Sequence, residues 1–421
     1  MKAEKKVEQE EEEEAVKGGE LLFCGATRRS AGGGRNVGNF VSLTRLRPLV
    51  GVNIRLVVSG CASFHCVALD VEGRCYTWGR NEKGQLGHGD TMQHDMPAVV
   101  SKLSQHTVVG AAAGRSHTVL VTKDGLSFSF GWNKHGQLGT GSSKNEVESS
   151  PVHCLVSEVR TAACGADFSV WLTSVEGASI LTAGLPQYGQ LGHGTDNEYN
   201  TKSSSVRLAY EAQPCPKTLA SLAGETIVKV ACGTNHTVAV DANGFVYTWG
   251  FGGYGRLGHR EQKDEWIPRR VDIFTKHNVL PPDAIISAGS LNSACTAGGG
   301  QLYMWGKIKN AGDDWMYPKP LMDLSDELES KFSVAKRTNK KGAYKTSENS
   351  EKSKSKDSSE LEEDKEKDSD DESDDGQAEQ KMQRGGKTGR GRDNGALKLT
   401  PEKKSAECAR GKGKSAKRGR R

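Results

Sequence analysis

The sequence has no long apolar segment and no cysteine pattern typical of a metal site. A membrane-spanning helix needs about 18–20 consecutive apolar residues, and charged residues such as Arg55 and Asp70 interrupt every candidate stretch. The N-terminal run from Met1 to Glu14 is rich in glutamate and lacks the apolar core of a secretory signal. None of the ten cysteines forms a Cys-x-x-Cys pair, and no His-x-x-x-His pair occurs. We therefore expect no membrane partner, no metal and no cofactor.

Aromatic residues are scarce in the last part of the chain. The 97 residues from Ser325 to Arg421 contain two aromatic side chains and no Trp, but 26 Lys or Arg and 21 Asp or Glu. Such a segment cannot bury enough apolar surface to offset the entropy lost on ordering. All seven Trp lie before residue 325. The composition predicts a disordered acidic N-terminus over residues 1–19, a folded region over residues 20–324 and a disordered tail over residues 325–421.

A repeat of about fifty residues dominates the folded region. Short apolar segments that end in glycine lie at residues 75–79, 128–131, 181–184, 246–250 and 302–306, and a shorter copy lies at 22–25. Their last residues are Gly25, Gly79, Gly131, Gly184, Gly250 and Gly306, at steps of 54, 52, 53, 66 and 56 residues. Four of the five steps agree within four residues, which indicates one structural unit copied along the chain.

Each unit carries further marks around this glycine. A Gly-x-x-His-Thr segment precedes it, as at Gly233–Thr237, and a glycine loop follows it, as at Gly84–Gly89. We expect a proline such as Pro97 to open the next strand, because the first residue of a strand needs no N–H. Four short strands in about fifty residues are typical of a β-propeller blade. The sequence therefore predicts an all-β fold, a β-propeller.

The combination of Cys-Gly-x-x-His-Thr, Val-Tyr-Thr-Trp-Gly and Gly-x-Leu-Gly-His resembles the regulator of chromosome condensation repeat family, in particular its second type in a plant-like version. The segments Trp78–Asp90 and Trp249–His259 carry this resemblance. Members of the family form seven-bladed rings, whereas the repeat here ends after Met322. We therefore expect an incomplete propeller of about five blades, produced by a C-terminally truncated chain.

The resemblance also implies a function. It implies a guanine-nucleotide exchange factor or regulator of a small GTPase, Ran-like or Rac-like, that is linked to chromatin, DNA, microtubules and mitosis. It implies a location in the nucleus, with the cytoplasm as an alternative. No Ser/His/Asp arrangement or carboxylate pair stands out from the repeats, so we expect no covalent enzyme chemistry. The alternatives are a non-catalytic scaffold, a nonfunctional truncated product, and a nucleic-acid-binding protein that acts through its tail.

Residues that recur in every unit are expected to be structural, because a catalytic group is needed only once. We expect His65, His117 and His236 to shape the blades by hydrogen bonds to neighbouring backbone groups. Trp78, Trp249 and Trp305 are expected to pack between blades. The recurring glycines are expected to supply turns with positive φ.

Two irregular segments are the candidates for partner binding. The step of 66 residues contains an insertion between Gly194 and Glu225, in which Tyr199, Arg207 and Tyr210 are candidate contact residues; a tolerated surface insertion is the alternative. The tail contains an acidic stretch (357–379, net charge −11) and a basic stretch (380–421, net charge +12). Its candidate phosphate-binding residues are Arg384, Arg390, Arg392, Lys417, Arg418, Arg420 and Arg421.

Overall fold

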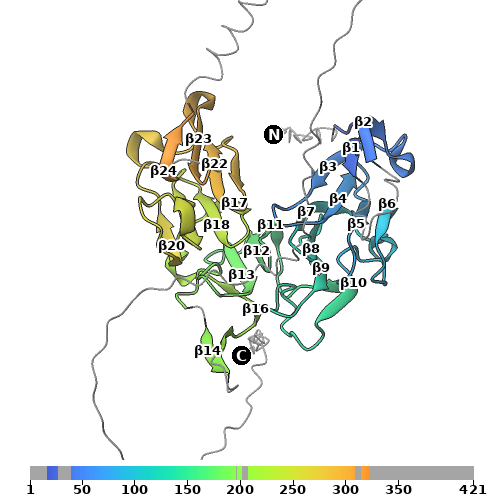
Figure 1. Ribbon diagram of the computed structural model, residues 1–421, viewed down its shortest axis with the longest axis horizontal. Coiled ribbons are helices and arrows are strands. Elements are labelled where there is room, and N and C mark those ends of the chain that lie inside the picture. The colour runs from blue at the N-terminus through green and yellow to red at the C-terminus, as the bar shows by residue number, and fades with distance from the viewer. Residues whose placement is uncertain (1–16, 27–38, 196, 202–206, 309–313, 322–421) are drawn as a thin grey trace, which may run out of the picture. The chain divides into compact units, whose positions relative to one another are not determined.

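The computed structural model describes residues 17–26, 39–195, 197–201, 207–308 and 314–321 (Figure 1). Residues 1–16 and the whole segment predicted as a disordered tail, 325–421, lie outside this part of the chain. The described residues form strands and short 3-10 helices. None of the described helices has the length and the apolar character needed to cross a membrane.

Five four-stranded antiparallel sheets follow one another along the chain. Sheet 1 contains β3 (Ile54–Val58), β4 (His65–Asp70), β5 (Cys75–Gly79) and β6 (His94–Val99). Sheet 2 contains β7 (Val108–Ala113), β8 (His117–Thr122), β9 (Ser127–Trp132) and β10 (Val147–His153). Sheet 3 contains β11 (Val159–Cys164), β12 (Phe168–Thr173), β13 (Ile180–Gly184) and β16 (Gln213–Thr218). Sheet 4 contains β17 (Ile227–Cys232), β18 (His236–Asp241), β19 (Val246–Gly250) and β20 (Glu265–Arg270). Sheet 5 contains β21 (Ile286–Ala288), β22 (Asn292–Thr296), β23 (Leu302–Gly306) and β24 (Trp315–Pro320).

Two smaller sheets and six 3-10 helices complete the described elements. β1 (Leu22–Ala26) pairs with β2 (Asn39–Arg45), and β14 (Glu198–Thr201) pairs with β15 (Arg207–Tyr210). The 3-10 helices are η1 (Arg47–Leu49), η2 (Ser101–Leu103), η3 (Ala220–Leu222), η4 (Gly253–Gly255), η5 (Lys276–Asn278) and η6 (Gly298–Gly300).

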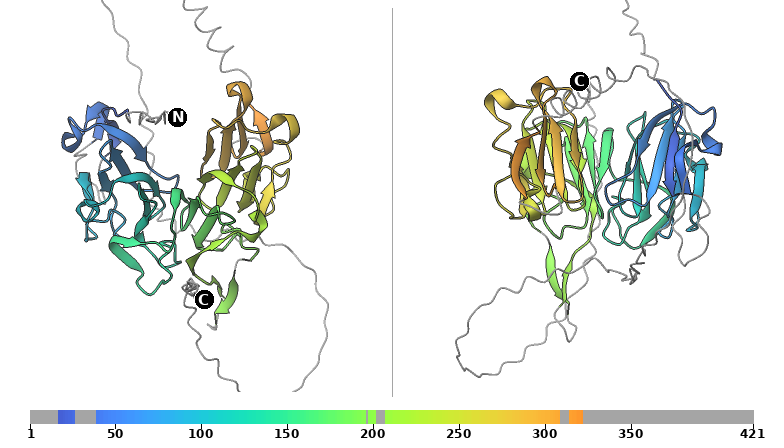
Figure 2. Two further views of the ribbon diagram at one scale, coloured as in Figure 1. Left: turned by 180° about the vertical axis from the view of Figure 1, so that it is seen from behind. Right: turned by 45° about the horizontal axis from the view of Figure 1, so that its top comes forward.

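The order of strands in space equals their order in the chain within each four-stranded sheet (Figure 2). This up-and-down arrangement, repeated five times, is that of propeller blades. The prediction of an all-β propeller with about five four-stranded units is confirmed.

The hydrophobic core lies between the sheets rather than within any one of them. Each pair of consecutive sheets shares one cluster of buried apolar side chains. Each cluster contains at least one large aromatic residue without solvent exposure; these include Phe130 between sheets 1 and 2, Trp171 between 2 and 3, Trp249 between 3 and 4, and Trp305 between 4 and 5. A four-stranded sheet with apolar side chains on both faces is stable only when neighbouring sheets cover those faces.

The sheet β1–β2 reproduces the outer half of a blade. Gly25 lies opposite Phe40 as Gly79 lies opposite His94, and both strand pairs contain a bulge beside this glycine. Trp78 is buried in a cluster between this half-sheet and sheet 1. Among the described residues, β1 pairs with β2 alone, so its other edge carries no strand.

The prediction that a proline opens the outer strand is wrong. Pro97 is the fourth residue of β6, and Pro268 is the fourth residue of β20. In sheet 1 the register jumps between Ala98 and His94, so Pro97 lies inside a bulge, where its missing N–H breaks no ladder bond. A bulge on an outer strand tolerates proline as well as a strand end does.

The recurring glycine of each third strand, its last or last-but-one residue, has a left-handed backbone. Its φ is +112° at Gly79, +111° at Gly131, +125° at Gly184, +101° at Gly250 and +97° at Gly306, and +106° at Gly25 of the half-sheet. In the five complete sheets a Cβ atom would also collide with the backbone of the neighbouring strand. At Gly131 it would stand 2.4 Å from the carbonyl oxygen of Ser116. Both the dihedral angle and the space therefore require glycine.

Replacing this glycine should destabilise the fold, and a matched glycine in the same sheet should not. We expect Gly131→Ala to lower the free energy of unfolding by about 3 kcal/mol, because it adds a left-handed alanine and a backbone clash. Gly110→Ala is the control, since its Cβ would meet only Val121 at 3.5 Å and its φ is not positive; we expect a change within about 1 kcal/mol. Urea unfolding of both variants tests this, and equal losses would contradict it.

Candidate functional site

Two kinds of loop meet at the same end of every sheet. The residue after the third-strand glycine donates its backbone N–H to a carbonyl in the loop between the first and second strands. These bonds run from Arg80 to Phe64 (3.0 Å), Trp132 to Ser116 (2.8 Å), Leu185 to Asp167 (3.0 Å), Phe251 to Asn235 (2.9 Å) and Lys307 to Leu291 (3.0 Å). We call this end of the sheets the loop end; it is where propellers vary most freely.

The recurring histidines connect neighbouring sheets. Nε2 of His65 lies 2.7 Å from the hydroxyl of Thr118 in the next sheet, and that hydroxyl donates to the carbonyl of Gln85 at 2.8 Å. The hydroxyl proton is thus committed, so Nε2 must carry the proton that His65 donates. The expected partner was a backbone group, whereas the structure places a side-chain hydroxyl between the histidine and the backbone. A side chain is needed here because the neighbouring strand's own backbone groups are used in its sheet.

The same arrangement recurs at two other junctions. Nε2 of His117 lies 2.9 Å from Ser169, and Nε2 of His236 lies 2.8 Å from Ser293. Each serine donates to a carbonyl of the preceding glycine loop, at Gln137 and Arg256 respectively. All three histidines are buried.

Burial keeps these imidazoles neutral. It lowers the pKa of His65 to about 4 and those of His117 and His236 to about 3. Nδ1 of His236 is buried and has no partner in the described part of the chain, so a second proton there would find no acceptor among these residues. These residues hold the sheets together and have no contact with a site for chemistry.

The tryptophans named above are buried in the clusters between sheets, with exposed fractions of 4% or less for Trp78, Trp249 and Trp305. The indole N–H of Trp249 donates to the carbonyl of Gln190 at 2.9 Å. Their faces are covered by neighbouring side chains, so none of them offers a surface to a ligand.

The insertion forms a β-hairpin on the third-to-fourth-strand loop of sheet 3, and it projects away from that sheet (Figures 1 and 2). Tyr199 pairs with Ala209, and Arg207 pairs with Thr201. The side chains of Tyr199 and Arg207 lie outside the described part of the chain, whereas Tyr210 is half-buried. The hairpin closes where the N–H of Glu211 donates to Asn197 at 3.0 Å.

A buried carboxylate lies at the same end of sheet 3 as this hairpin. Asp167 lies in the first loop of sheet 3, and its residue is 9% exposed. Its Oδ2 lies 3.8 Å from Nη2 of Arg115, and its Oδ1 is buried with no hydrogen-bond partner among the described residues. Burial raises the pKa of Asp167, and Arg115 opposes that rise. A buried carboxylate oxygen without a donor is costly, and it is a position that a partner's cation or N–H can satisfy.

Arg115 carries its charge from Asp167 toward the base of the hairpin. It is one of the causes that lower the pKa of His135 to about 4, after burial and Lys134. The carbonyl of His135 accepts the N–H of Gln213, where the chain returns from the hairpin. We call the pair of Asp167 and Arg115, at the loop end of sheets 2 and 3, the Asp167 site.

The sequence prediction missed Asp167. The equivalent positions in the other sheets are Phe64, Ser116, Asn235 and Leu291, all uncharged. Comparing the repeats position by position would have singled out the one unit with a carboxylate there. The candidate residues of the basic tail, Arg384, Arg390, Arg392, Lys417, Arg418, Arg420 and Arg421, lie outside the described residues.

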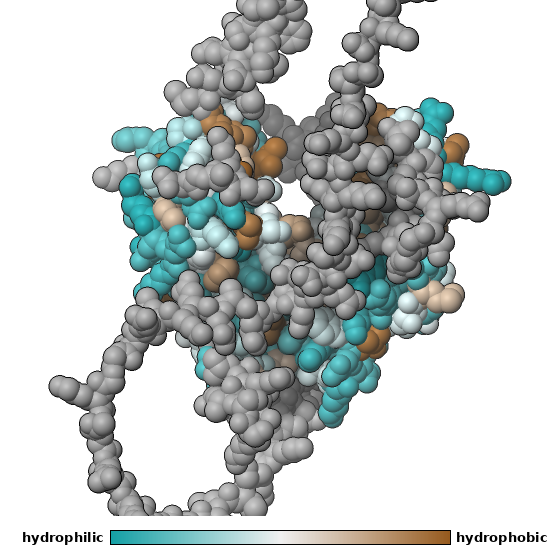
Figure 3. Space-filling model, in the orientation of Figure 1, coloured by the Kyte–Doolittle hydropathy of each residue, from teal (hydrophilic) through white to brown (hydrophobic). Residues whose placement is uncertain are grey.

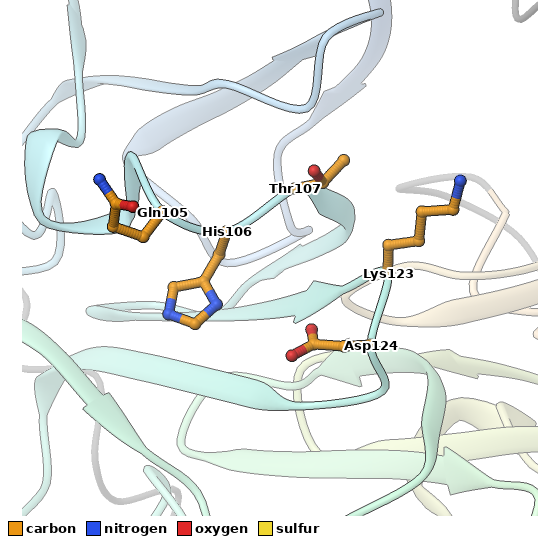
Figure 4. A pocket seen from close by; sticks show the side chains of 5 residues that line it. All are labelled: Gln105, His106, Thr107, Lys123 and Asp124. Atoms are coloured by element: carbon orange, nitrogen blue, oxygen red, sulfur yellow. The ribbon is translucent and has the colours of Figure 1, made fainter.

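A polar pocket of about 320 Å³ lies at the opposite end of sheet 2 (Figure 4). Gln105, His106, Thr107, Lys123 and Asp124 line it. The ring of His106 packs against Phe128 at 4.7 Å between centroids, and the Lys123 side chain points away from Asp124. The groups do not converge on one point, so we assign no ligand to it. On the face shown in Figure 3, hydrophobic residues form separate spots rather than one patch.

Comparison with known proteins identifies the repeat. A model of the regulator of chromosome condensation (RCC1) repeat matches residues 72–121, 124–172, 179–240 and 243–294, and a second model of this repeat matches residues 57–85, 108–137 and 227–256. The chain belongs to the RCC1 repeat family. Human RCC2 is 38% identical over 333 residues, an alignment that covers 73% of this chain and 62% of RCC2. The predicted resemblance to this family and its second type is confirmed, although the chain spans less than two thirds of that relative's length.

Solved structures support the RCC1 fold. Human WBSCR16 has a TM-score of 0.56 and 22% identity, covering 72% of this chain and 77% of that protein. Prp20p from Saccharomyces cerevisiae has a TM-score of 0.54 and 20% identity, covering 68% of each chain. At these identities the likeness establishes the fold alone.

The buried histidines make the RCC1 repeats sensitive to acid. A histidine whose folded pKa is lowered contributes stability that is complete above its unfolded pKa, near 6.5, and is lost as pH falls toward the folded value. At pH 5 each such histidine should lower the free energy of unfolding by about 2 kcal/mol relative to neutral pH, at 1.36 kcal/mol per pH unit below the unfolded pKa. We expect His117→Gln, which keeps an N–H donor but does not titrate, to lose about 2 kcal/mol less than the parent between pH 7 and pH 5.

Urea unfolding at both pH values measures this difference. His277→Gln is the control, because His277 is exposed and lies in η5, outside the strands; its pH dependence should equal that of the parent. If His117→Gln showed the full parental loss, the acid sensitivity would not come from the histidines between the sheets.

Proposed function

We propose that this chain binds a small GTPase, Ran-like or Rac-like, through the Asp167 site and the adjacent β14–β15 hairpin. The observation that carries this proposal is the buried Oδ1 of Asp167, which has no partner among the described residues and lies at the same end of sheet 3 as a projecting hairpin. Membership of the RCC1 repeat family supports it, and so does the fold shared with Prp20p, whose structure has been described together with its binding to Gsp1p and histones.

Exchange activity would follow from preferential binding to one state of the GTPase. A protein that contacts the nucleotide-free GTPase more strongly than the loaded form raises the rate of nucleotide release, with no covalent step. A rigid, buried carboxylate suits this role because it is already desolvated before the partner binds. A cationic or N–H group of the partner would then supply the hydrogen bond that the buried oxygen lacks. A non-catalytic scaffold would bind the GTPase and leave the release rate unchanged.

The site of action follows from the same proposal. A GTPase regulator of the RCC1 type would act in the nucleus at chromatin, and on microtubules in mitosis, with the cytoplasm as the alternative location. The nuclear assignment rests on the family and on the basic residues near the C-terminus.

Exchanging the hairpin for a shorter natural loop tests the proposal. Gly194 and Gln213 of sheet 3 correspond to Gly89 and His94 of sheet 1, where the fourth strand begins after four residues. We expect replacement of residues 195–212 by the Asp90–Gln93 loop to weaken capture of nucleotide-free GTPase at least tenfold, without lowering the urea midpoint. The companion variant Tyr199→Ala/Tyr210→Ala should also weaken capture of nucleotide-free GTPase without lowering the urea midpoint.

Asp167→Asn separates binding from folding in the same assay. Removing a buried carboxylate whose Oδ1 has no donor should leave stability unchanged or raise it, while capture should fall if Asp167 meets the partner. Release of fluorescent GDP from Ran-like and Rac-like GTPases then distinguishes exchange factor from scaffold. Parental capture by both the loop exchange and Asp167→Asn would rule out this surface.

The basic tail supports a second function, binding of nucleic acid. Residues 380–421 carry a net charge of +12, and the segment contains no aromatic residue for stacking on bases. Contacts of Lys and Arg with phosphates release counterions and give affinity that falls with salt. Sequence-independent DNA binding is therefore the form we propose.

Deleting residues 380–421 should abolish salt-sensitive DNA binding and reduce nuclear accumulation. We expect the circular dichroism spectrum of the sheets to remain unchanged. Fluorescence anisotropy with duplex DNA at 50 and 200 mM salt, and microscopy of tagged chains, measure the two effects. Unaltered DNA binding and unaltered nuclear retention in the deletion would refute a role for the tail.

A further inference from the structure

The loops after the third strands carry a row of cations and aromatic rings. The row is formed by the first and fourth residues after the recurring third-strand glycine. The first position holds Arg80, Trp132, Leu185, Phe251 and Lys307, and the fourth holds Lys83, His135, Tyr188 and Tyr254. The fourth-position residue of one sheet meets the first-position residue of the next at three junctions. Nζ of Lys83 lies 5.7 Å from the centroid of the Trp132 ring, and Nζ of Lys307 lies 5.0 Å from that of Tyr254.

Positive charge is concentrated where this row crosses from sheet 1 to sheet 2. The half-buried ring of Trp132 has Nζ of Lys83 at 5.7 Å and Nζ of Lys134 at 6.0 Å, and the His135 ring meets it edge-on at 5.3 Å. Both lysines are exposed. We call Lys83, Trp132 and Lys134 the Trp132 platform.

The charges of the platform are not neutralised within the described part of the chain. Neither lysine forms an ion pair there, since Glu82 pairs with Arg80 and Asp167 pairs with Arg115. Two ammonium groups held beside an indole combine the features of a binding hot spot: a flat apolar surface at the centre and charges at its rim. A ligand that matches it has carboxylates on either side of an apolar side chain.

A continuous polyanion fits this surface less well. Glu82 is the chain neighbour of Lys83 and pairs with Arg80, so an evenly charged phosphate backbone would meet a carboxylate on that side. Binding of single-stranded nucleic acid usually needs a groove of one charge with rings free to stack. Acidic side chains at separate points of a peptide can avoid this carboxylate and reach the two lysines.

We propose that the Trp132 platform binds an acidic segment of a partner protein in which an aromatic or aliphatic side chain stands between Asp or Glu residues. The apolar side chain covers the indole of Trp132, and the flanking carboxylates pair with Lys83 and Lys134. This contact is independent of the GTPase assignment, because it requires neither the hairpin nor Asp167.

The test uses the full chain and a defined probe. The probe is a fluorescein-labelled 12-residue peptide of four Asp-Phe-Glu repeats, in which one Phe is replaced by photoreactive benzoylphenylalanine. We expect Lys83→Glu/Lys134→Glu to weaken binding at least tenfold in fluorescence anisotropy, and Trp132→Ala to weaken it at least fivefold. Lys123→Glu, at the opposite end of sheet 2, is the charge-matched control and should bind within twofold of the parent.

Three further measurements decide the outcome. Thermal unfolding must be the same for the parent and for Lys83→Glu/Lys134→Glu, whose sites are exposed. A peptide with Ser in place of Phe should bind at least fivefold more weakly, and cross-links should map to residues 80–83 and 132–135. Cross-links confined to the basic residues 380–421, equal affinity of all variants, or tighter binding of a 12-nucleotide oligouridylate at the same residues would overturn the proposal.

Discussion

Neighbouring sheets of this propeller are held in position by buried hydrogen-bond chains. In each chain a histidine of one sheet donates to a hydroxyl of the next, and the hydroxyl donates back to a glycine-loop carbonyl of the first sheet, as in His65, Thr118 and Gln85. Apolar clusters supply most of the attraction between sheets, but apolar contact has little directional preference. A slide of one sheet against the next would leave several buried polar groups unpaired, at about 1–3 kcal/mol each. The position of every loop at the loop end depends on this constraint.

The junction of sheets 3 and 4 shows how such a chain is replaced. Phe168 occupies the histidine position of sheet 3, so the hydroxyl of Thr237 has no imidazole to accept from and faces only the thiol of Cys232, a weak partner. The loop carbonyl of Gln190 is nevertheless satisfied, because the indole N–H of Trp249 donates to it at 2.9 Å. The junction therefore keeps the acceptor paired and tolerates one idle hydroxyl. One unit can therefore lack the recurring histidine when another side chain, here Trp249, donates to the buried loop carbonyl that would otherwise be unpaired.

The parts of the fold that follow from local chemistry were predictable from the sequence. The glycines at 79, 131, 184, 250 and 306 mark the third strands because only glycine accepts their φ and their close backbone contact. The position of Pro97 was not predictable, since a bulge depends on pairing with the neighbouring strand. The carboxylate of Asp167 could have been found by aligning the repeats, but the missing donor at its Oδ1 could not, because it is a property of packing and not of a motif. The hairpin was visible as extra length, but its strands and its place beside His135 required the fold.

Binding sites on a repeat protein arise where one unit departs from the others. The inner positions of each unit, such as the third-strand Thr77, Thr182 and Thr248, make the same hydrogen bond in sheet after sheet and leave no freedom for function. The first position after the third-strand glycine is held at the loop end through its backbone N–H, so it holds Arg, Trp, Leu, Phe and Lys in turn. Rigidity at the inner positions is what makes this variation useful, because each new side chain is presented at a defined place. A carboxylate at one unit and an indole between two lysines at another thus become different surfaces on the same scaffold.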